Sequence, residues 1–307
     1  MDIGCPFSCR FGVNRLGGNW CCAGQRGYGD RILADIPLQR WRRQFDTRGG
    51  SLQRSRHHGD DRVAVISANS CAYVPIVVGS CDFTVEQLAS ASTHGTEFVF
   101  IPSAGRISVG DQLKALATNE TVIFTYDPPV TGAPTQLNVG EFFEFSVTEP
   151  VHIQTDGQVQ IARFSISSTA GSPGQPGDSF QAEVAPVGKF TNRHTFSIDN
   201  YGVGGSPTQR LDVVTTSVNC VFLDGGRVPP SAFVPVGTGA FLAASLEIEP
   251  GQHVLESDPV SGVTVYGFAD WEGNGTIVIG RAASVDCGLF LDGFESGDTD
   301  AWSSVTP

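Results

Sequence analysis

The sequence of 307 residues has little of what several protein classes require. Charged residues make up only 17%, and no apolar run approaches the roughly 20 residues of a membrane-spanning helix. The N-terminus shows no basic stretch followed by an apolar one, which is the pattern of a secretion signal. The G-x-S-x-G, H-E-x-x-H and P-loop motifs are also missing. An enzymatic function therefore has no positive support, and we predict a non-catalytic protein with no membrane span, no cofactor and no metal site.

Basic residues are in the minority. The chain has 19 Lys and Arg against 32 Asp and Glu, for a net charge of −13. This balance argues against binding to nucleic acids, because neutralising their phosphates needs clustered Lys and Arg. The charge is also uneven: residues 1–62 hold 11 Arg, no Lys, 6 Asp and no Glu, a net of +5, whereas residues 63–307 hold 8 basic and 26 acidic groups, a net of −18. The composition therefore changes sharply near residue 60.

Residues 1–56 show neither strand alternation nor helical periodicity. They contain four cysteines, Cys5, Cys9, Cys21 and Cys22. A zinc knuckle is one hypothesis, but the C-x3-C and C-C spacings do not fit paired C-x2-C ligands, and His57 and His58 lie far away. We predict instead an irregular or spurious segment, produced by a mis-called start or a shifted reading frame. A secretion signal would then be missing from this chain.

From His57 onward the sequence is typical of β structure. It is rich in Gly, Pro, Phe and β-branched residues, with 37 Gly, 18 Pro and 20 Phe in the chain. A weak repeat links HHGDDRVAVIS (57–67), VHIQTDGQVQIARFS (151–165) and QHVLESDPVSGVTVYGF (252–268), each with a His, an Asp and an alternating apolar strand. In FEFSV, alternation puts Phe143, Phe145 and Val147 on one face. We predict an all-β fold of two tandem antiparallel β-sandwich-like modules, with β-propeller blades as the alternative.

Changes in composition and stretches rich in Gly and Pro divide the chain into five predicted parts. The irregular segment covers 1–56, and residues 57–93 form the end of a truncated β module together with the loop between Cys71 and Cys81. Module 1 and a linker cover 94–179, with a hairpin turning at Asn119-Glu120 and a loop rich in Gly, Pro and Ser at 168–179. Module 2 covers 180–288, and a tail covers 289–307.

The cysteines after residue 60 suit cross-links. Cys71 and Cys81 enclose a loop of 11 residues without His ligands on both sides, so a disulfide is favoured over a metal pair or free thiols. Such a bridge would stabilise the fold by ~3 kcal/mol in the loop-entropy model. Cys220 and Cys287 either pair with each other or are separate buried thiols, and the sequence does not choose between these alternatives.

Several polar groups invite a catalytic or metal-binding hypothesis. The histidines are His94, His152, His194 and His253, of which His152 and His253 take matching repeat positions, each followed by an Asp, Asp156 or Asp258. Recurrence in two modules indicates a structural role, in which His and Asp side chains tie turns to the backbone. The carboxylate pairs Glu141/Glu144 and Glu247/Glu249 would need to flank a cleft, about 5–10 Å apart, to act as a glycosidase does. Alternation points the first pair to opposite faces, and a solvent-facing edge explains the second equally well.

Separated motifs resemble a known family. They are C-A-Y-V-P…C-D-x-x-V-E-Q-L…G-T-E-F-V-x-x-P-x-A-G-R within 71–106, VNCVFLDG (218–225) and EPGQHVLESDPVSGVTVYGF (249–268). Over roughly residues 57–288 the chain resembles the IgG Fc-binding protein N-terminal domain family of mucin-associated and bacterial surface proteins. It departs from the family where ADWEGNGTIVIG (269–280) replaces an aromatic Tyr-Gly-Tyr-Pro-Gly run. The tail, LFLDGFESGDTDAWSSVTP (289–307), resembles a C-terminal segment of secreted proteobacterial proteins.

The resemblance implies a function outside the cell. We expect a non-catalytic binding or adhesion protein, secreted or at the cell surface, that recognises a surface glycoprotein or glycan such as a mucin-like partner. A carbohydrate-active enzyme and an architectural spacer in a surface assembly are the alternatives. The ligand-binding residues and the oligomeric state are not predicted.

Overall fold

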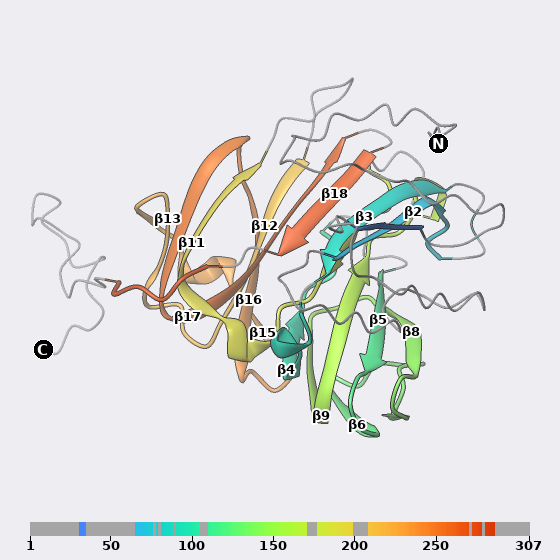
Figure 1. The fold of residues 1–307 in the computed structure, drawn as a ribbon. Coiled ribbons are helices and arrows are strands. Elements are labelled where there is room, and N and C mark those ends of the chain that lie inside the picture. The colour runs from blue at the N-terminus through green and yellow to red at the C-terminus, as the bar shows by residue number, and fades with distance from the viewer. Residues whose placement is uncertain are drawn as a thin grey trace, which may run out of the picture.

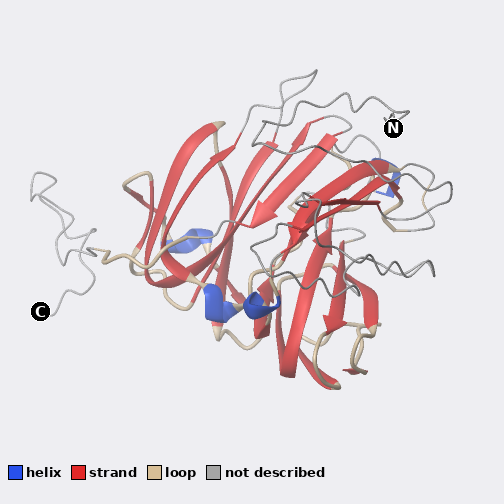
Figure 2. Cartoon of the chain, viewed as in Figure 1, coloured by secondary structure: helices blue, strands red, loops and turns tan. Residues whose placement is uncertain are grey.

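The structure is a computed structural model, which describes residues 31–34, 65–75, 78, 81–88, 90–104, 110–170, 177–198, 208–269, 272–277 and 280–285. Within these ranges the regular structure is strand, with only short 3-10 turns between strands (Figure 2). The all-β prediction is confirmed. No helix in the described ranges has the length and apolar character needed to span a membrane.

A small antiparallel sheet lies at the N-terminal side. It consists of β1 (Arg31–Ala34), β2 (Val65–Ala72) and β3 (Asp82–Leu88), in that order (Figure 1). Strand β1 pairs with β2, so this part of the predicted irregular segment is in fact extended. The rest of residues 1–56, including Cys5, Cys9, Cys21 and Cys22, lies outside the described residues.

Module 1 is a curled sheet built around the long strand β9 (Val151–Phe164). The other strands are β4 (Gly95–Phe100), β5 (Asp111–Ala117), β6 (Val122–Asp127), β7 (Gln136–Leu137), β8 (Phe142–Val147) and β10 (Gln181–Glu183). Strands β5 and β6 follow one another along the same edge of β9, and β4 and β10 lie along the opposite edge. The hairpin predicted at Asn119-Glu120 is therefore wrong, because β5 and β6 pair with β9 and not with each other.

Module 2 is a second curled sheet with the same pairing pattern around β17 (Gly251–Ala269). Its other strands are β11 (Thr191–Ile198), β12 (Thr208–Thr215), β13 (Val221–Leu223), β14 (Gly226–Arg227), β15 (Val234–Val236), β16 (Phe241–Glu247) and β18 (Glu272–Ile277). Strands β12 and β13 share one edge of β17, as β5 and β6 share one edge of β9, while β11 and β18 take the places of β4 and β10. The weak sequence repeat therefore corresponds to a repeated topology.

The border between the two sheets lies slightly later than the sequence predicted. Strand β10 pairs with β9, so the first sheet extends to Glu183 and the second begins at Thr191, whereas the predicted module border was at residue 180. Residues 171–176 of the predicted linker and the tail 289–307 lie outside the described residues. The division of the chain into domains stays a prediction beyond this point.

Each module has its own apolar core, formed by the alternating residues of its strands. In module 1, Phe145 and Val147 belong to this core, as alternation predicted, whereas Phe143 is 43% exposed. In module 2, Leu211 and Val213 of β12 point into the core. Asp212 and Val214, which alternate with them, therefore point out of the core of module 2 and toward module 1. The alternation along β12 therefore places one set of side chains in the core of module 2 and the other set at the junction between the modules.

Candidate functional site

The disulfide predicted from the sequence is present. Cys71 and Cys81 are joined, with their Cα atoms 4.9 Å apart, which is an ordinary separation. The loop they enclose docks on module 1, where Ser167 N–H donates to the Val74 carbonyl at 2.7 Å and Val74 N–H donates to Ser167 Oγ at 3.1 Å. These two bonds connect the loop to the segment that follows β9. Cys220 is also disulfide-bonded and no free thiol, while its candidate partner Cys287 lies outside the described residues.

Three of the candidate histidines form hydrogen bonds at separate places in the structure. His152 Nε2 lies 2.9 Å from Glu97 Oε1, and His253 bonds Asp224 through Nδ1 and the Glu249 carbonyl through Nε2, both at 2.7 Å. His194 Nε2 lies 3.0 Å from the Ser261 carbonyl. The described part of the chain has no group of three His, Cys, Asp or Glu side chains arranged to hold a metal. His152 and His253 stand at the beginning of the two long strands, which fits the structural role inferred from the repeat.

The candidate carboxylate pairs serve turns and surface contacts. Glu141 accepts hydrogen bonds from Asn138 N and Nδ2, both at 2.9 Å, and Glu144 pairs with Lys114 at 2.6 Å. Glu247 is 72% exposed in its side chain and lies 3.4 Å from Arg210 Nη2. Asp156, which follows His152, accepts a hydrogen bond from Ile123 N–H at 2.7 Å. None of these contacts places two carboxyl groups across a cleft.

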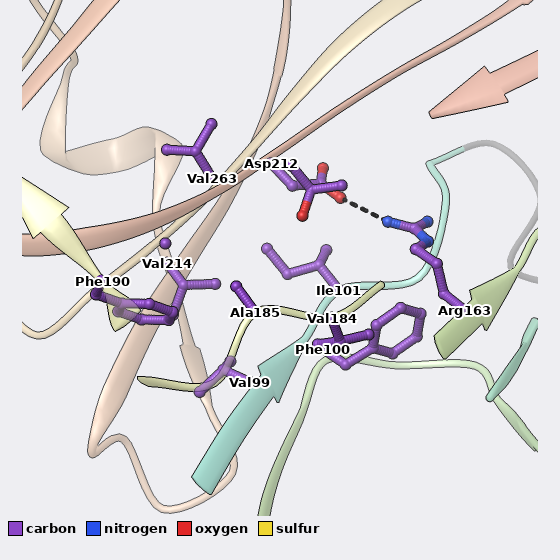
Figure 3. Close-up of a pocket in the computed structure, with 12 residues that line it drawn as sticks. Val99, Phe100, Ile101, Arg163, Val184, Ala185, Phe190, Asp212, Val214 and Val263 are labelled. Carbon is purple, nitrogen blue, oxygen red and sulfur yellow. Dashed lines mark ion pairs between the residues drawn. The ribbon is translucent and has the colours of Figure 1, made fainter. Parts of the chain in front are cut away.

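The most unusual polar cluster lies between the modules, and sequence reasoning missed it. Arg163 of β9 is only 2% exposed, and its Nη2 donates to Asp111 Oδ2 at 2.5 Å and to Ser103 Oγ at 2.8 Å. Its Nη1 lies 3.7 Å from Oδ2 of Asp212, on β12 of the other module, as the dashed line of Figure 3 marks. A single guanidinium thus faces one carboxylate from each module.

Aromatic rings enclose this guanidinium. The rings of Phe100, Phe180 and Tyr266 have their centroids 5.1, 5.3 and 5.2 Å from Arg163 Cζ, within the range of cation–π attraction. The Tyr266 hydroxyl also accepts a hydrogen bond from Ala104 N–H at 2.9 Å, which links β17 to the loop after β4. The cluster is therefore apolar at its periphery and ionic at its centre.

The electrostatics of the cluster are unbalanced. Burial by itself would lower the pKa of Arg163, but Asp111 and Asp212 outweigh it and raise that pKa, so the guanidinium stays charged. Burial raises the pKa of Asp212 to about 7, although Arg163, Ser245 and Tyr266 favour its ionised form. Neither carboxylate oxygen of Asp212 has a hydrogen-bond partner of normal geometry within the described ranges.

A small cavity adjoins the cluster. Its volume of about 20 Å³ has room for one water molecule. Figure 3 shows the side chains around it, which come from both modules and are mostly apolar: Val99, Phe100, Ile101, Arg163, Val184, Ala185, Phe190, Asp212, Val214, Gly262, Val263 and Thr264. The cavity therefore lies within the contact between the two modules.

A second set of contacts strengthens this junction. Asp127 Oδ2, at the end of β6, accepts hydrogen bonds from Thr238 N–H at 2.7 Å and Thr238 Oγ1 at 2.6 Å, and these bonds lower the pKa of Asp127. The rings of His152 and Phe241 meet edge to face at 4.9 Å. A shared apolar cluster lies beside them, formed by Val99, Ile101, Val214, Val236, Phe241 and Ala243. The modules are therefore packed directly on one another.

The sequence does contain a signal for this junction. In the run Val159, Ile161, Arg163, the arginine takes the position that alternation assigns to the core face of β9. A charged residue at a core position requires a buried partner. The pattern alone, however, does not say that the partners are Asp111 and Asp212.

Comparison with known proteins adds one match. A family model described as IgGFc binding protein matches residues 47–267, a span that contains both the Cys71–Cys81 loop and the strands of the junction. No curated protein gives a significant match to the chain. No solved structure gives one either.

Proposed function

The chain belongs to the IgGFc binding protein family, and from this premise we propose that it is a non-catalytic extracellular binding or adhesion protein whose partner is a surface glycoprotein. The family match over residues 47–267 carries the proposal, since it covers well over half of the chain. The family is one of binding domains. The name of the family describes a glycoprotein ligand, and we extend to this chain only the class of partner.

The cross-links support a place outside the cell. Disulfides persist in oxidising compartments, and both the Cys71–Cys81 bridge and the bonded state of Cys220 suit such a setting. Secretion or attachment at a cell surface is therefore part of the proposal. A bacterial origin rests on the resemblance of the tail 289–307 alone.

The architecture supports binding through an outer surface. The cavity at the junction has room for one water molecule, and its charged lining groups, Arg163 and Asp212, face each other at 3.7 Å. A partner as large as a glycoprotein would instead be met by the exposed strands and loops of two modules that are packed together. Such a body keeps its contact residues in place without a deep pocket, which lowers the entropy lost on binding.

The test is a binding measurement with the full chain. Immobilised IgG Fc, the same Fc after enzymatic removal of its glycans, a mucin and unglycosylated albumin would be compared by biolayer interferometry. We expect saturable binding to at least one of the two glycoproteins and none to albumin. Weaker binding to deglycosylated Fc would point to the glycan itself as the ligand.

Absence of binding to every glycoprotein, with a chain that is folded by circular dichroism, would overturn the proposal. It would favour the alternative of an architectural spacer in a surface assembly. The positions of Glu141, Glu144 and Glu247 in turn and surface contacts offer nothing that favours a carbohydrate-active enzyme.

A further inference from the structure

The two carboxylates of the junction are not equivalent. Asp111 Oδ2 receives Arg163 Nη2 at 2.5 Å, Ser103 Oγ at 2.9 Å and Ser103 N–H at 3.1 Å. Asp212 has Arg163 Nη1 at 3.7 Å, and the hydroxyls of Ser245 and Tyr266 also favour its ionised form, but no donor forms a hydrogen bond of normal geometry with it in the part of the chain that the structure describes. Because an ionised carboxylate without well-formed hydrogen bonds is costly in an apolar interior, Asp212 gains more from a proton than Asp111 does.

The position of Asp212 links its charge to the packing of the modules. It is 3% exposed, points out of module 2 toward module 1, and lines the cavity between them (Figure 3). The charged and titratable groups that face it are Arg163 from β9, Asp111 from β5 and Tyr266 from β17. With both aspartates ionised, the buried cluster carries a net charge of −1, and with Asp212 protonated it is neutral.

We propose that Asp212 is a proton-binding site that makes the junction between the two modules sensitive to pH. In mildly acidic surroundings Asp212 holds a proton, and the junction is neutral and closely packed. Above neutrality the proton is released, the cluster gains a buried negative charge, and the contact between the modules weakens. The proposal is independent of the glycoprotein partner.

The sign of the effect follows from proton binding. The pKa of Asp212 is raised by burial from an ordinary 3.8 to about 7. Between pH 4 and 7 the folded chain therefore binds more protons than the unfolded chain, and its stability falls as the pH rises through this window. Above the folded pKa the two states bind equally, so the loss levels off.

A second carboxyl group with a raised pKa also makes the stability fall as the pH rises, so its effect must be distinguished from that of Asp212. Burial, and secondly the charge of Glu183, raise the pKa of Glu86 on β3 to about 8. Glu86 belongs to the N-terminal sheet, whose strand β3 contacts β10, and it is not among the groups that shift the pKa of Asp212 or of Arg163. The variant Glu86→Gln is therefore a control that removes one half-buried carboxyl and leaves Arg163, Asp111 and Asp212 in place.

The experiment compares the full chain with its D212N and E86Q variants. Infrared difference spectra between pH 4.5 and 8.5 would follow the C=O band of protonated carboxyl groups. We expect a band that titrates near pH 7 in the wild type and in E86Q. In D212N this component should be missing, and only the component of Glu86, near pH 8, should remain. Thermal unfolding should show a midpoint that drops by several degrees from pH 5 to pH 8 in the wild type, and by clearly less in D212N.

Two results would overturn the proposal. One is a D212N variant that keeps the component near pH 7 and the full pH dependence of the wild type. The other is a wild type and E86Q in which no buried carboxyl titrates near neutral pH. The second result needs no folded D212N, so the proposal can fail even if that variant does not fold.

Discussion

Arg163 shows how one residue can connect two sheets. Its side chain stands on the core face of β9, yet its partners are Asp111 of the same module, Asp212 of the other, and three aromatic rings. A buried charge is tolerated only when it is paired and hydrogen-bonded. The residue therefore links the surfaces that meet at the junction, although it adds little to the apolar core itself.

Replacing Arg163 with Met should strongly destabilise the chain. The loss leaves Asp111 buried without its counter-ion, and breaking such a pair typically costs about 3–5 kcal/mol. Urea unfolding would measure the change. The control is Arg210→Met, whose partner Glu247 is largely exposed, and it should cost at most about 1 kcal/mol. Equal losses in the two variants would contradict the prediction.

At the scale of elements, the long strands β9 and β17 organise the fold. Each is flanked on both edges, so each carries the pairing of four other strands. Close approach to these strands demands small residues. At Gly262 of β17 an added Cβ would overlap the ring of Phe190, which lies between η4 (Val187–Lys189) and β11.

The variant Gly262→Ala should therefore lose about 1–3 kcal/mol, the usual cost of overpacking. Chemical denaturation would measure it. Gly188→Ala, at a position with nothing within 4 Å of the added Cβ, should stay within about 0.5 kcal/mol of the wild type. If the Gly262 variant also stays within that limit, the close packing of Phe190 on β17 is wrong.

The disulfide that links β2 to the start of β3 should stabilise the fold. Cys71→Ser, Cys81→Ser and the double variant should all lose roughly 3 kcal/mol or less, because each removes the same cross-link from the unfolded chain. Unfolding under non-reducing conditions would compare them. A double variant that loses twice as much as either single one would show that the thiols act separately.

For the whole molecule, the junction makes the modules dependent on each other. Besides the Arg163 cluster, the Asp127–Thr238 hydrogen bonds and the shared apolar cluster around Phe241 cross from one sheet to the other. Burial of large apolar side chains between two sheets couples their unfolding, as it does within one core.

We therefore expect one calorimetric transition for both modules, with equal calorimetric and van't Hoff enthalpies. Phe241→Ala should lower the stability by about 3–5 kcal/mol, since Phe241 is buried at the junction. Val234→Ala, at a position that is 53% exposed on β15, serves as the control and should have little effect. Two well-separated transitions in the wild type would contradict this account.

The sequence predicted what depends on neighbouring residues. Alternation indicated strands, the recurrence of a His, an Asp and an apolar strand indicated a repeat, and the spacing of Cys71 and Cys81 indicated a disulfide. It failed at Asn119-Glu120, where a turn signal suggested a hairpin, because nothing local shows that β5 and β6 both pair with β9. It also missed β1, whose partner β2 lies more than 30 residues further along the chain.

The sequence by itself determined the all-β class, the repeat and the family, because alternation, spacing and motif order are properties of short stretches. Only the tertiary structure decided that the modules pack on one another and that Arg163 is shared between Asp111 and Asp212. The reason is that a buried charge at a core position calls for a partner without specifying it. That choice depends on which strands of two separate sheets come together, and no single stretch of the chain contains it.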